Sequence, residues 1–225
     1  MSWDPTWETV FQNHDWGRYP PEELIRFIAR RYFSAPERDQ VKVLEVGCGT
    51  GANIWFLARE GFDAYGIDGS ETAIFKAESR MREEGVKAHL QVKDAITLAG
   101  VYPAHHFDAV IDVACLQHNK LSAVDAILDQ VYLVMKPGGS IYSMMVTSDS
   151  YGADLGKEIE PGTFIEVTEG PLHERGLGHF FTLEEVQLLF ERFTDVQIEH
   201  SARSMGNRTN WYNHWVIEGL KPYEQ

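Results

Sequence analysis

The stretch "VKVLEVGCGTGANIWFLAREG", residues 41–61, decides the fold. It begins with the apolar run Val41–Val46, passes through glycines at Gly47, Gly49 and Gly51, and continues with apolar residues at helical spacing. Glycines are needed where a backbone turns sharply and then approaches a ligand, because a Cβ would occupy the space of the ligand. A strand, a glycine turn and a helix in this order predict a nucleotide-like ligand at the end of the strand.

The alternation of strand and helix patterns continues after this stretch. Candidate strands at 63–68, 86–94, 107–116 and 140–147 alternate with helix patterns at 70–85 and 121–135. A further helix at 182–193 precedes two late strands, 195–202 and 210–220, which are close enough to pair as an antiparallel hairpin. We therefore predict an α/β, Rossmann-like doubly wound fold with a mostly parallel seven-stranded sheet and helices on both faces.

We expect a single domain with four parts. Residues 1–36 would form N-terminal cap helices, 41–147 the cofactor-binding core, and 181–219 the final helix and β-hairpin. Residues 148–180 are rich in glycine and acidic residues and have no helical period. A connection of this length is uncommon in a compact domain, so it is expected to be a lid or substrate loop inserted after the fifth strand.

Composition limits the class of partner. The chain has 225 residues, of which 44% are hydrophobic and 24% charged, and its formal net charge is −14. No window approaches about 18 consecutive apolar residues, and the acidic N-terminus lacks the pattern of a secretory signal, so no membrane span is expected. Cys48 and Cys115 both lie in apolar surroundings, which favours reduced thiols and a cytoplasmic location. A negative surface repels nucleic acid, so we expect a small-molecule partner and a monomer or homodimer.

The glycine spacing permits two interpretations. Gly47, Gly49 and Ala52 fit the dinucleotide pattern G-x-G-x-x-G/A, whereas Glu45 and the three glycines together fit E-x-G-x-G-x-G. In either case Asp68, about twenty residues further on, can accept hydrogen bonds from ribose hydroxyls. No basic residue occurs between positions 43 and 58. This absence favours a cationic ligand over one with phosphates.

Five motifs in sequence order favour the second pattern. They are "LEVGCGTGAN", "GIDGS", "VKDA", "FDAVIDVACLQH" and "LVMKPGGSI". Over roughly residues 41–146 the chain resembles the class I S-adenosylmethionine-dependent methyltransferases. The resemblance implies S-adenosyl-L-methionine as cofactor, S-adenosyl-L-homocysteine as product, and in-line methyl transfer to an oxygen, nitrogen or carbon atom of a small-molecule acceptor.

The resemblance also implies cofactor contacts at the ends of four strands. The glycine loop would pass under the amino acid part and the ribose edge, and the second-strand acid would bind the ribose hydroxyls. Residues after the second and third strands would contact adenine, and those after the fourth would line the methionine side. In that order, these residues are Glu45, Gly47, Cys48, Gly49 and Gly51; Asp68; Gly69, Ser70, Asp94 and Ala95; and Asp112, Val113 and Gln117.

The remaining candidates would contact the acceptor or close the pocket. His118 follows the fourth strand and is our candidate catalytic base; the alternative is a packed histidine that shapes the pocket. Arg18 would pair with the methionine carboxylate, and the rings of Trp16 and Tyr19 would form a wall of the pocket. The alternative is that this segment is only a hydrophobic anchor. Further polar candidates for acceptor contact are His173, Arg175, His179, Arg203, Arg208 and Trp211. No spacing of ligands predicts a metal site.

Three other functions stay open at this stage. An NAD(P)-dependent oxidoreductase could use the same turn, although no catalytic Tyr/Lys pair follows the fourth or fifth strand. A binding protein could have kept the cofactor pocket without chemistry. A protein or peptide methyltransferase with a basic substrate would suit the acidic charge. The acceptor itself cannot be identified from sequence, because one scaffold supports many reactions.

Overall fold

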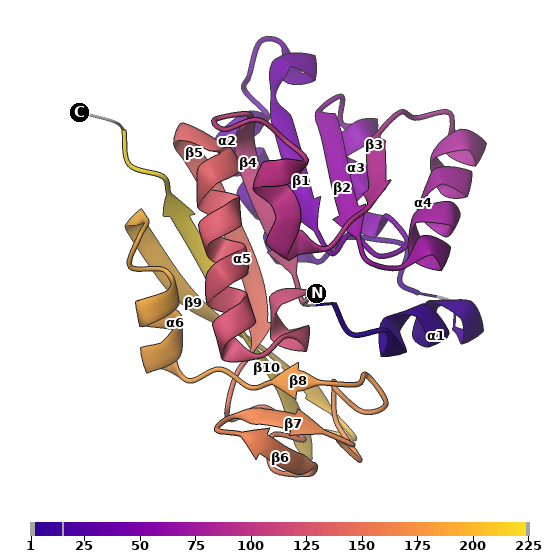
Figure 1. Ribbon diagram of the computed structural model, residues 1–225, viewed down its shortest axis with the longest axis vertical. Coiled ribbons are helices and arrows are strands. Elements are labelled where there is room, and N and C mark those ends of the chain that lie inside the picture. The colour runs from indigo at the N-terminus through magenta and orange to yellow at the C-terminus, as the bar shows by residue number, and fades with distance from the viewer. Residues whose placement is uncertain (1–2, 15, 224–225) are drawn as a thin grey trace.

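The computed structural model describes residues 3–14 and 16–223. Its main sheet has seven strands in the order β3-β2-β1-β4-β5-β10-β9 (Figure 1). Strands β1 to β5 are parallel, β10 is antiparallel to β5, and β9 is antiparallel to β10. The predicted fold class and the C-terminal hairpin are thus confirmed. The strands are β1 (Lys42–Val46), β2 (Asp63–Asp68), β3 (His89–Val92), β4 (Phe107–Val113), β5 (Met135–Val146), β9 (Thr194–Met205) and β10 (Asn210–Leu220).

Helices cover both faces of the sheet because its side chains alternate between two cores. Val43 and Ile111 pack with α2 (Glu22–Tyr32), α3 (Ala52–Arg59) and α4 (Glu71–Glu84) on one face. Leu44 and Val110 pack with α5 (Leu121–Val134), α6 (Leu183–Leu189) and the short helix η2 (Ala95–Gly100) on the other. Neighbouring strand residues point to opposite faces, so an apolar run fills both cores.

Helix ends follow the local signals closely. Ser70 caps α4 by accepting a hydrogen bond from Ala73 N–H, and Gly85 ends the helix in the left-handed conformation. Thr182 and Glu185 form a capping box at the start of α6. Some predicted bounds were wrong: α6 ends at Leu189 rather than near 193, β3 is shorter than the predicted 86–94, and β5 begins at Met135 rather than at 140.

The insertion after β5 contains a small sheet that the sequence pattern did not predict. Strands β6 (Lys157–Glu160), β7 (Thr163–Ile165) and β8 (Gly178–His179) pair antiparallel. Strands this short show no measurable periodicity, and β8 pairs with a strand thirteen residues or more away along the chain, so local patterns cannot reveal them.

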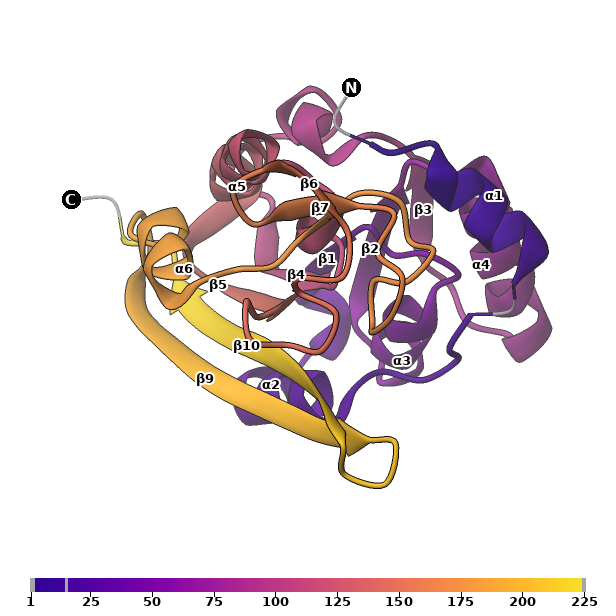
Figure 2. The same cartoon turned by 90° about the horizontal axis from the view of Figure 1, so that it is seen from below.

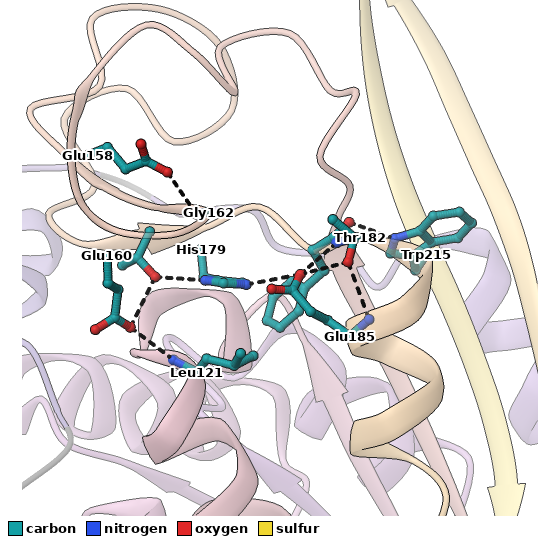
Figure 3. A network of polar contacts seen from close by, with 10 residues as sticks. Leu121, Glu158, Glu160, Gly162, His179, Thr182, Glu185 and Trp215 are labelled. Atoms are coloured by element: carbon teal, nitrogen blue, oxygen red, sulfur yellow. Dashed lines mark hydrogen bonds and ion pairs between the residues drawn. The ribbon is translucent and has the colours of Figure 1, made fainter.

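Polar contacts anchor this small sheet to the core (Figure 3). The buried hydroxyl of Thr163 donates to Glu160 Oε1 at 3.2 Å and lies 2.7 Å from Nδ1 of His179. The same Glu160 oxygen accepts from Leu121 N–H at the start of α5 at 3.4 Å, and His179 Nε2 lies 3.4 Å from Glu185 Oε2 of α6. Burial lowers the pKa of His179, although Glu185 opposes the effect.

The carboxyl ends of the parallel strands meet at one edge of the sheet, the lower edge in Figure 1. The helix α1 (Thr6–Asn13) and the small sheet both lie at this edge, as the view from below also shows (Figure 2). In open α/β sheets, ligands bind at this edge. Among the described residues, no helix is both long and apolar enough to cross a bilayer.

The Thr163 network provides a test of how the insertion is held. We expect Thr163→Val to lower the free energy of unfolding by about 1–3 kcal/mol, because the isosteric change leaves His179 Nδ1 buried without a partner. Urea denaturation measures the difference. Thr168→Val is the matched control, since Thr168 is exposed and bonds only to the carbonyl of Leu155. Equal effects of the two substitutions would contradict the structural role of the network.

Candidate functional site

The glycine turn after β1 forms the floor of the site. Gly47, Gly49 and Gly51 have φ values of 66°, 50° and 79°, in the left-handed region that favours glycine. An added Cβ at Gly47 would lie 2.2 Å from the Sγ atom of Cys115. The turn therefore tolerates no side chain at this position, and its backbone reaches the cavity directly.

Asp68, at the end of β2, connects the turn to the next helix. Its Oδ2 accepts from Gly49 N–H at 2.9 Å, and its Oδ1 accepts from Ser70 N–H at 2.8 Å. Burial raises the pKa of Asp68, while the two amide donors oppose the rise. Each oxygen keeps a second lone pair, so the carboxylate can accept further hydrogen bonds from a ligand.

Glu45 is the least satisfied acid of the site. The side chain is 2% exposed and lines the cavity. Its Oε1 accepts from Asn53 Nδ2 at 2.5 Å, whereas Oε2 has no hydrogen-bond partner among the described residues. Burial raises the pKa of Glu45 to about 8, and the negative charges of Asp112 and Asp68 add to the rise. A cationic group beside Oε2 would stabilise the ionised form of Glu45 and so lower its pKa.

Asp112 has a different role from the one the resemblance implies. Its Oδ1 accepts from the N–H groups of Cys115 and Leu116, and its Oδ2 accepts from the hydroxyl of Ser143 at 2.5 Å. It does not line the cavity. Both oxygens thus hold the chain after β4 in place. Burial raises its pKa to about 6.

A cavity of about 330 Å³ opens above the turn. This volume lies in the range of small-molecule sites. The candidate catalytic base His118 lines it, as do most residues predicted to bind the cofactor: Trp16, Glu45, Gly47, Cys48, Gly49, Asp68, Gly69, Asp94, Ala95, Val113 and Gln117.

The other marked residues lie outside the cavity lining. Gly51 is at the start of α3. Ser70 caps α4 and also donates to Glu8. Arg18, predicted to face a methionine carboxylate, instead lies on the surface with its guanidinium 3.5 Å from Glu84. It therefore makes no contribution to the cavity in this structure.

An aromatic roof, formed by Trp3, Trp7, Phe11 and Trp16, covers the cavity from the N-terminal side. Trp7 packs edge-on against Trp16 at 5.5 Å, and the ring of Trp3 lies against Gly69, where an added Cβ would come within 2.3 Å of it. Glu8 fixes α1 to the start of α4 through the hydroxyls of Ser70 and Thr72. Trp3, Trp7 and Phe11 are spaced four residues apart, a signal that could have identified this face from sequence.

His118, in the short helix η3 (Leu116–His118), projects into the same cavity. Its Nδ1–H donates to the carbonyl of Leu177 at 3.0 Å, because a carbonyl can only accept. Burial lowers the pKa of His118 to about 4. The ring is therefore neutral at physiological pH and keeps its lone pair on Nε2, where Gln117 Nε2 lies 3.4 Å away.

Of the polar residues proposed for acceptor contact, Arg175 alone lines the cavity. His173 Nδ1–H donates to the Val167 carbonyl at 3.0 Å, and His179 belongs to the Thr163 network. The arginines and tryptophan of the C-terminal hairpin lie outside the lining. Lining residues that sequence reasoning missed include Asp4, Asn53, Lys93, Asn119 and His214.

The site offers neither a thiol nucleophile nor a metal cluster. Cys48 and Cys115 are free, and burial raises the pKa of both thiols well above the usual value. Within residues 3–14 and 16–223, no group of three or more histidine, cysteine or acidic side chains could hold a metal ion. The cavity instead combines an acidic floor with an aromatic roof, which suits a ligand with a positive charge and a flat ring.

Comparison with known proteins points the same way. Residues 43–139 match a family model described as a methyltransferase domain. A ubiquinone biosynthesis O-methyltransferase of Azoarcus sp. is 36% identical over 103 residues, which is 45% of this chain and 42% of that protein. The chain thus spans less than half the length of this curated relative.

Solved structures agree over more of the chain. A SAM-dependent methyltransferase from Methanosarcina mazei superposes with a TM-score of 0.65 at 25% identity, covering 83% of this chain and 94% of the other. The [4+2]-cyclase SpnF superposes with a TM-score of 0.66 at 18% identity, covering 98% and 94%. The second likeness concerns the fold alone. Together with the motif order and the sheet order, the matched domain and these neighbours support a class I S-adenosylmethionine-dependent methyltransferase.

Proposed function

We propose that this protein transfers a methyl group from S-adenosylmethionine to a small-molecule acceptor. The observation that carries the proposal is the buried carboxyl group of Glu45, a residue that lines the cavity and whose Oε2 has no partner among the described residues. In the ionised form of Glu45, this atom requires a donor from the ligand. The ammonium group of the cofactor's amino acid part is a donor of the right charge.

The charge of the floor distinguishes this cofactor from a dinucleotide. Glu45 and Asp68 both lie at the glycine turn, and burial raises both pKa values. A pyrophosphate placed there would add negative charge to a region that already disfavours it. Asp68 and Asp94 also supply oxygens for ligand hydroxyl and amino groups, so the residues present fit S-adenosylmethionine.

When bound, S-adenosylmethionine supplies a methyl group made electrophilic by a positively charged sulfur. The protein then has to align the acceptor and exclude water. The aromatic roof covers the cavity and performs the second task. His118 performs the first: its neutral Nε2 accepts a hydrogen bond from an acceptor hydroxyl and orients the oxygen lone pair. Its low pKa makes it a weak base, so orientation is the larger part of its role.

A hydroxyl acceptor suits this arrangement best among the oxygen, nitrogen and carbon nucleophiles considered. The lone pair on His118 Nε2, which lies 3.4 Å from Gln117 Nε2, is an acceptor to which a hydroxyl can also donate. The relative from Azoarcus is named as an O-methyltransferase, which supports the same choice. The cavity is small enough to favour a small molecule over a protein substrate.

Ligand preference tests the proposed cofactor. We expect S-adenosylmethionine and S-adenosylhomocysteine to bind at micromolar strength in isothermal titration, with no binding of NAD or NADP. Asp68→Ala should weaken the adenosyl ligands tenfold or more, about 1.4 kcal/mol per decade, because it removes an acceptor and loosens the turn. Asp39→Ala, at an exposed acid outside the cavity, is the control. Binding of NAD in place of the adenosyl ligands would refute the assignment.

Proton release tests the role of Glu45. The raised pKa means that Glu45 is mostly protonated in the free protein at pH 6.5, and a cation beside Oε2 favours the ionised form. Binding of S-adenosylmethionine should therefore release close to one proton, as roughly estimated from linkage. Isothermal titrations in buffers with different ionisation enthalpies measure the number of protons released. Glu45→Gln should abolish the release and weaken binding, whereas Glu60→Gln, at an acid that pairs with Arg38, should change neither. Undiminished release from Glu45→Gln would show that another group carries the proton.

The protonation state of His118 is open to direct measurement. Because burial lowers its pKa to about 4, its ring nitrogens should show no titration between pH 5.5 and 8 in nitrogen-15 NMR spectra. The spectrum should show the neutral tautomer with the proton on Nδ1, and His118→Gln identifies the signal by its loss. Titration of His118 near pH 6.5 would mean that its contact with Leu177 is open in solution.

A further inference from the structure

The guanidinium of Arg175 is a cation in a cavity whose other charged lining is mainly acidic. It lies over the ring of Trp16, with Cζ 4.7 Å from the ring centroid. No hydrogen bond or ion pair to this guanidinium occurs within the part of the chain that the structure describes. Of the acids nearby, Asp4 is committed elsewhere: its two oxygens accept from Thr6 N–H at 2.9 Å and Leu177 N–H at 3.0 Å.

A guanidinium in this position is prepared for an oxyanion. Trp16 covers one face of the planar group, which fixes its orientation and leaves the N–H groups at its edge to donate. Arginine binds carboxylates and phosphates through two parallel hydrogen bonds, which a lysine cannot reproduce. Arg175 is half-buried, so water satisfies it only in part, and an anionic ligand would complete its contacts.

The place of Arg175 in the chain assigns it to the acceptor side of the cavity. It belongs to the insertion between β7 and β8, outside residues 43–139, which carry the family motifs. The carbonyl of Leu177, two residues further on, accepts from His118 Nδ1–H. The segment that carries Arg175 is thus fixed to the histidine proposed to orient the acceptor.

We propose that Arg175, held by Trp16, binds a carboxylate or phosphate group of a planar acceptor and so selects anionic aromatic substrates. This inference rests on the proposed function and names the class of its substrate. The flat walls come from the aromatic roof, the charge recognition from Arg175, and the contact with the reacting hydroxyl from His118. The cofactor's own carboxylate has the same chemistry, so the experiment must separate the two sources.

The experiment uses the full chain saturated with S-adenosylhomocysteine and two probes of the same shape, 2-naphthoate and 2-naphthamide. We expect wild-type protein to bind naphthoate at least tenfold more tightly than naphthamide in isothermal titration. Arg175→Gln should remove this preference while leaving the affinities for naphthamide and S-adenosylhomocysteine within about twofold. Arg175→Lys should keep part of it. Arg203→Gln, on the hairpin outside the cavity, is the matched control and should behave as wild type.

Each other outcome overturns the inference in a recognisable way. Equal affinity for the two probes, or no binding of either, means that no anion subsite exists. Loss of S-adenosylhomocysteine affinity in Arg175→Gln, with the naphthoate preference intact, assigns the arginine to the cofactor carboxylate. Failure of wild-type protein to bind S-adenosylhomocysteine refutes the proposed function itself. Thermal unfolding of each variant shows whether a loss of binding reflects a loss of fold.

Discussion

The carboxylate of Asp68 is the interaction on which the site depends. It accepts one hydrogen bond from the glycine turn after β1, at Gly49, and one from the start of α4, at Ser70. The turn is also tied to β2 by Cys48 N–H, which donates to the Ile67 carbonyl at 2.9 Å. Two strands, one turn and one helix therefore meet at a single side chain. Since the glycines themselves have no side chains, such external bonds must define the shape of the turn.

The three buried acids near the turn form a series. Both oxygens of Asp112 accept hydrogen bonds within the protein, and each oxygen of Asp68 accepts one. One oxygen of Glu45 has no partner among the residues that the structure describes. Burial raises the pKa of all three, to about 6 for Asp112 and to about 8 for Glu45. Burial thus disfavours the negative charge of these acids, and a cationic ligand would stabilise it. Such perturbed pKa values are typical of functional sites.

The floor of the site and its cover differ in how far they could be predicted from the sequence. The floor of the site was predictable because its parts are local: β1, the turn, β2 and the cap of α4 follow one another within thirty residues or so. The roof and the insertion carry local signals in their aromatic and glycine-rich composition, but contacts across the chain, such as Asp4 with Leu177, decide where they lie. Arg18, predicted to pair with the methionine carboxylate, lies at the surface beside Glu84, whereas Arg175, predicted for acceptor contact, lines the cavity. For Asp112, position at a strand end predicted a ligand contact, but one of its oxygens accepts from backbone amides after the strand and the other from the Ser143 hydroxyl.

Leu177 explains how the two covering segments act together. Its N–H donates to Asp4 at the base of the roof, and its carbonyl accepts from His118 Nδ1–H. Gly176 beside it has φ of +71°, and an added Cβ would lie 2.3 Å from Asp4 Oδ2, so the contact requires a glycine there. If either the roof or the insertion moved away alone, one polar group of this residue would lose its partner. Release of the carbonyl would also free the proton on His118 Nδ1 and with it the tautomer that keeps a lone pair on Nε2. The same two hydrogen bonds of Leu177 therefore hold the cover of the cavity in place and fix the tautomer of His118.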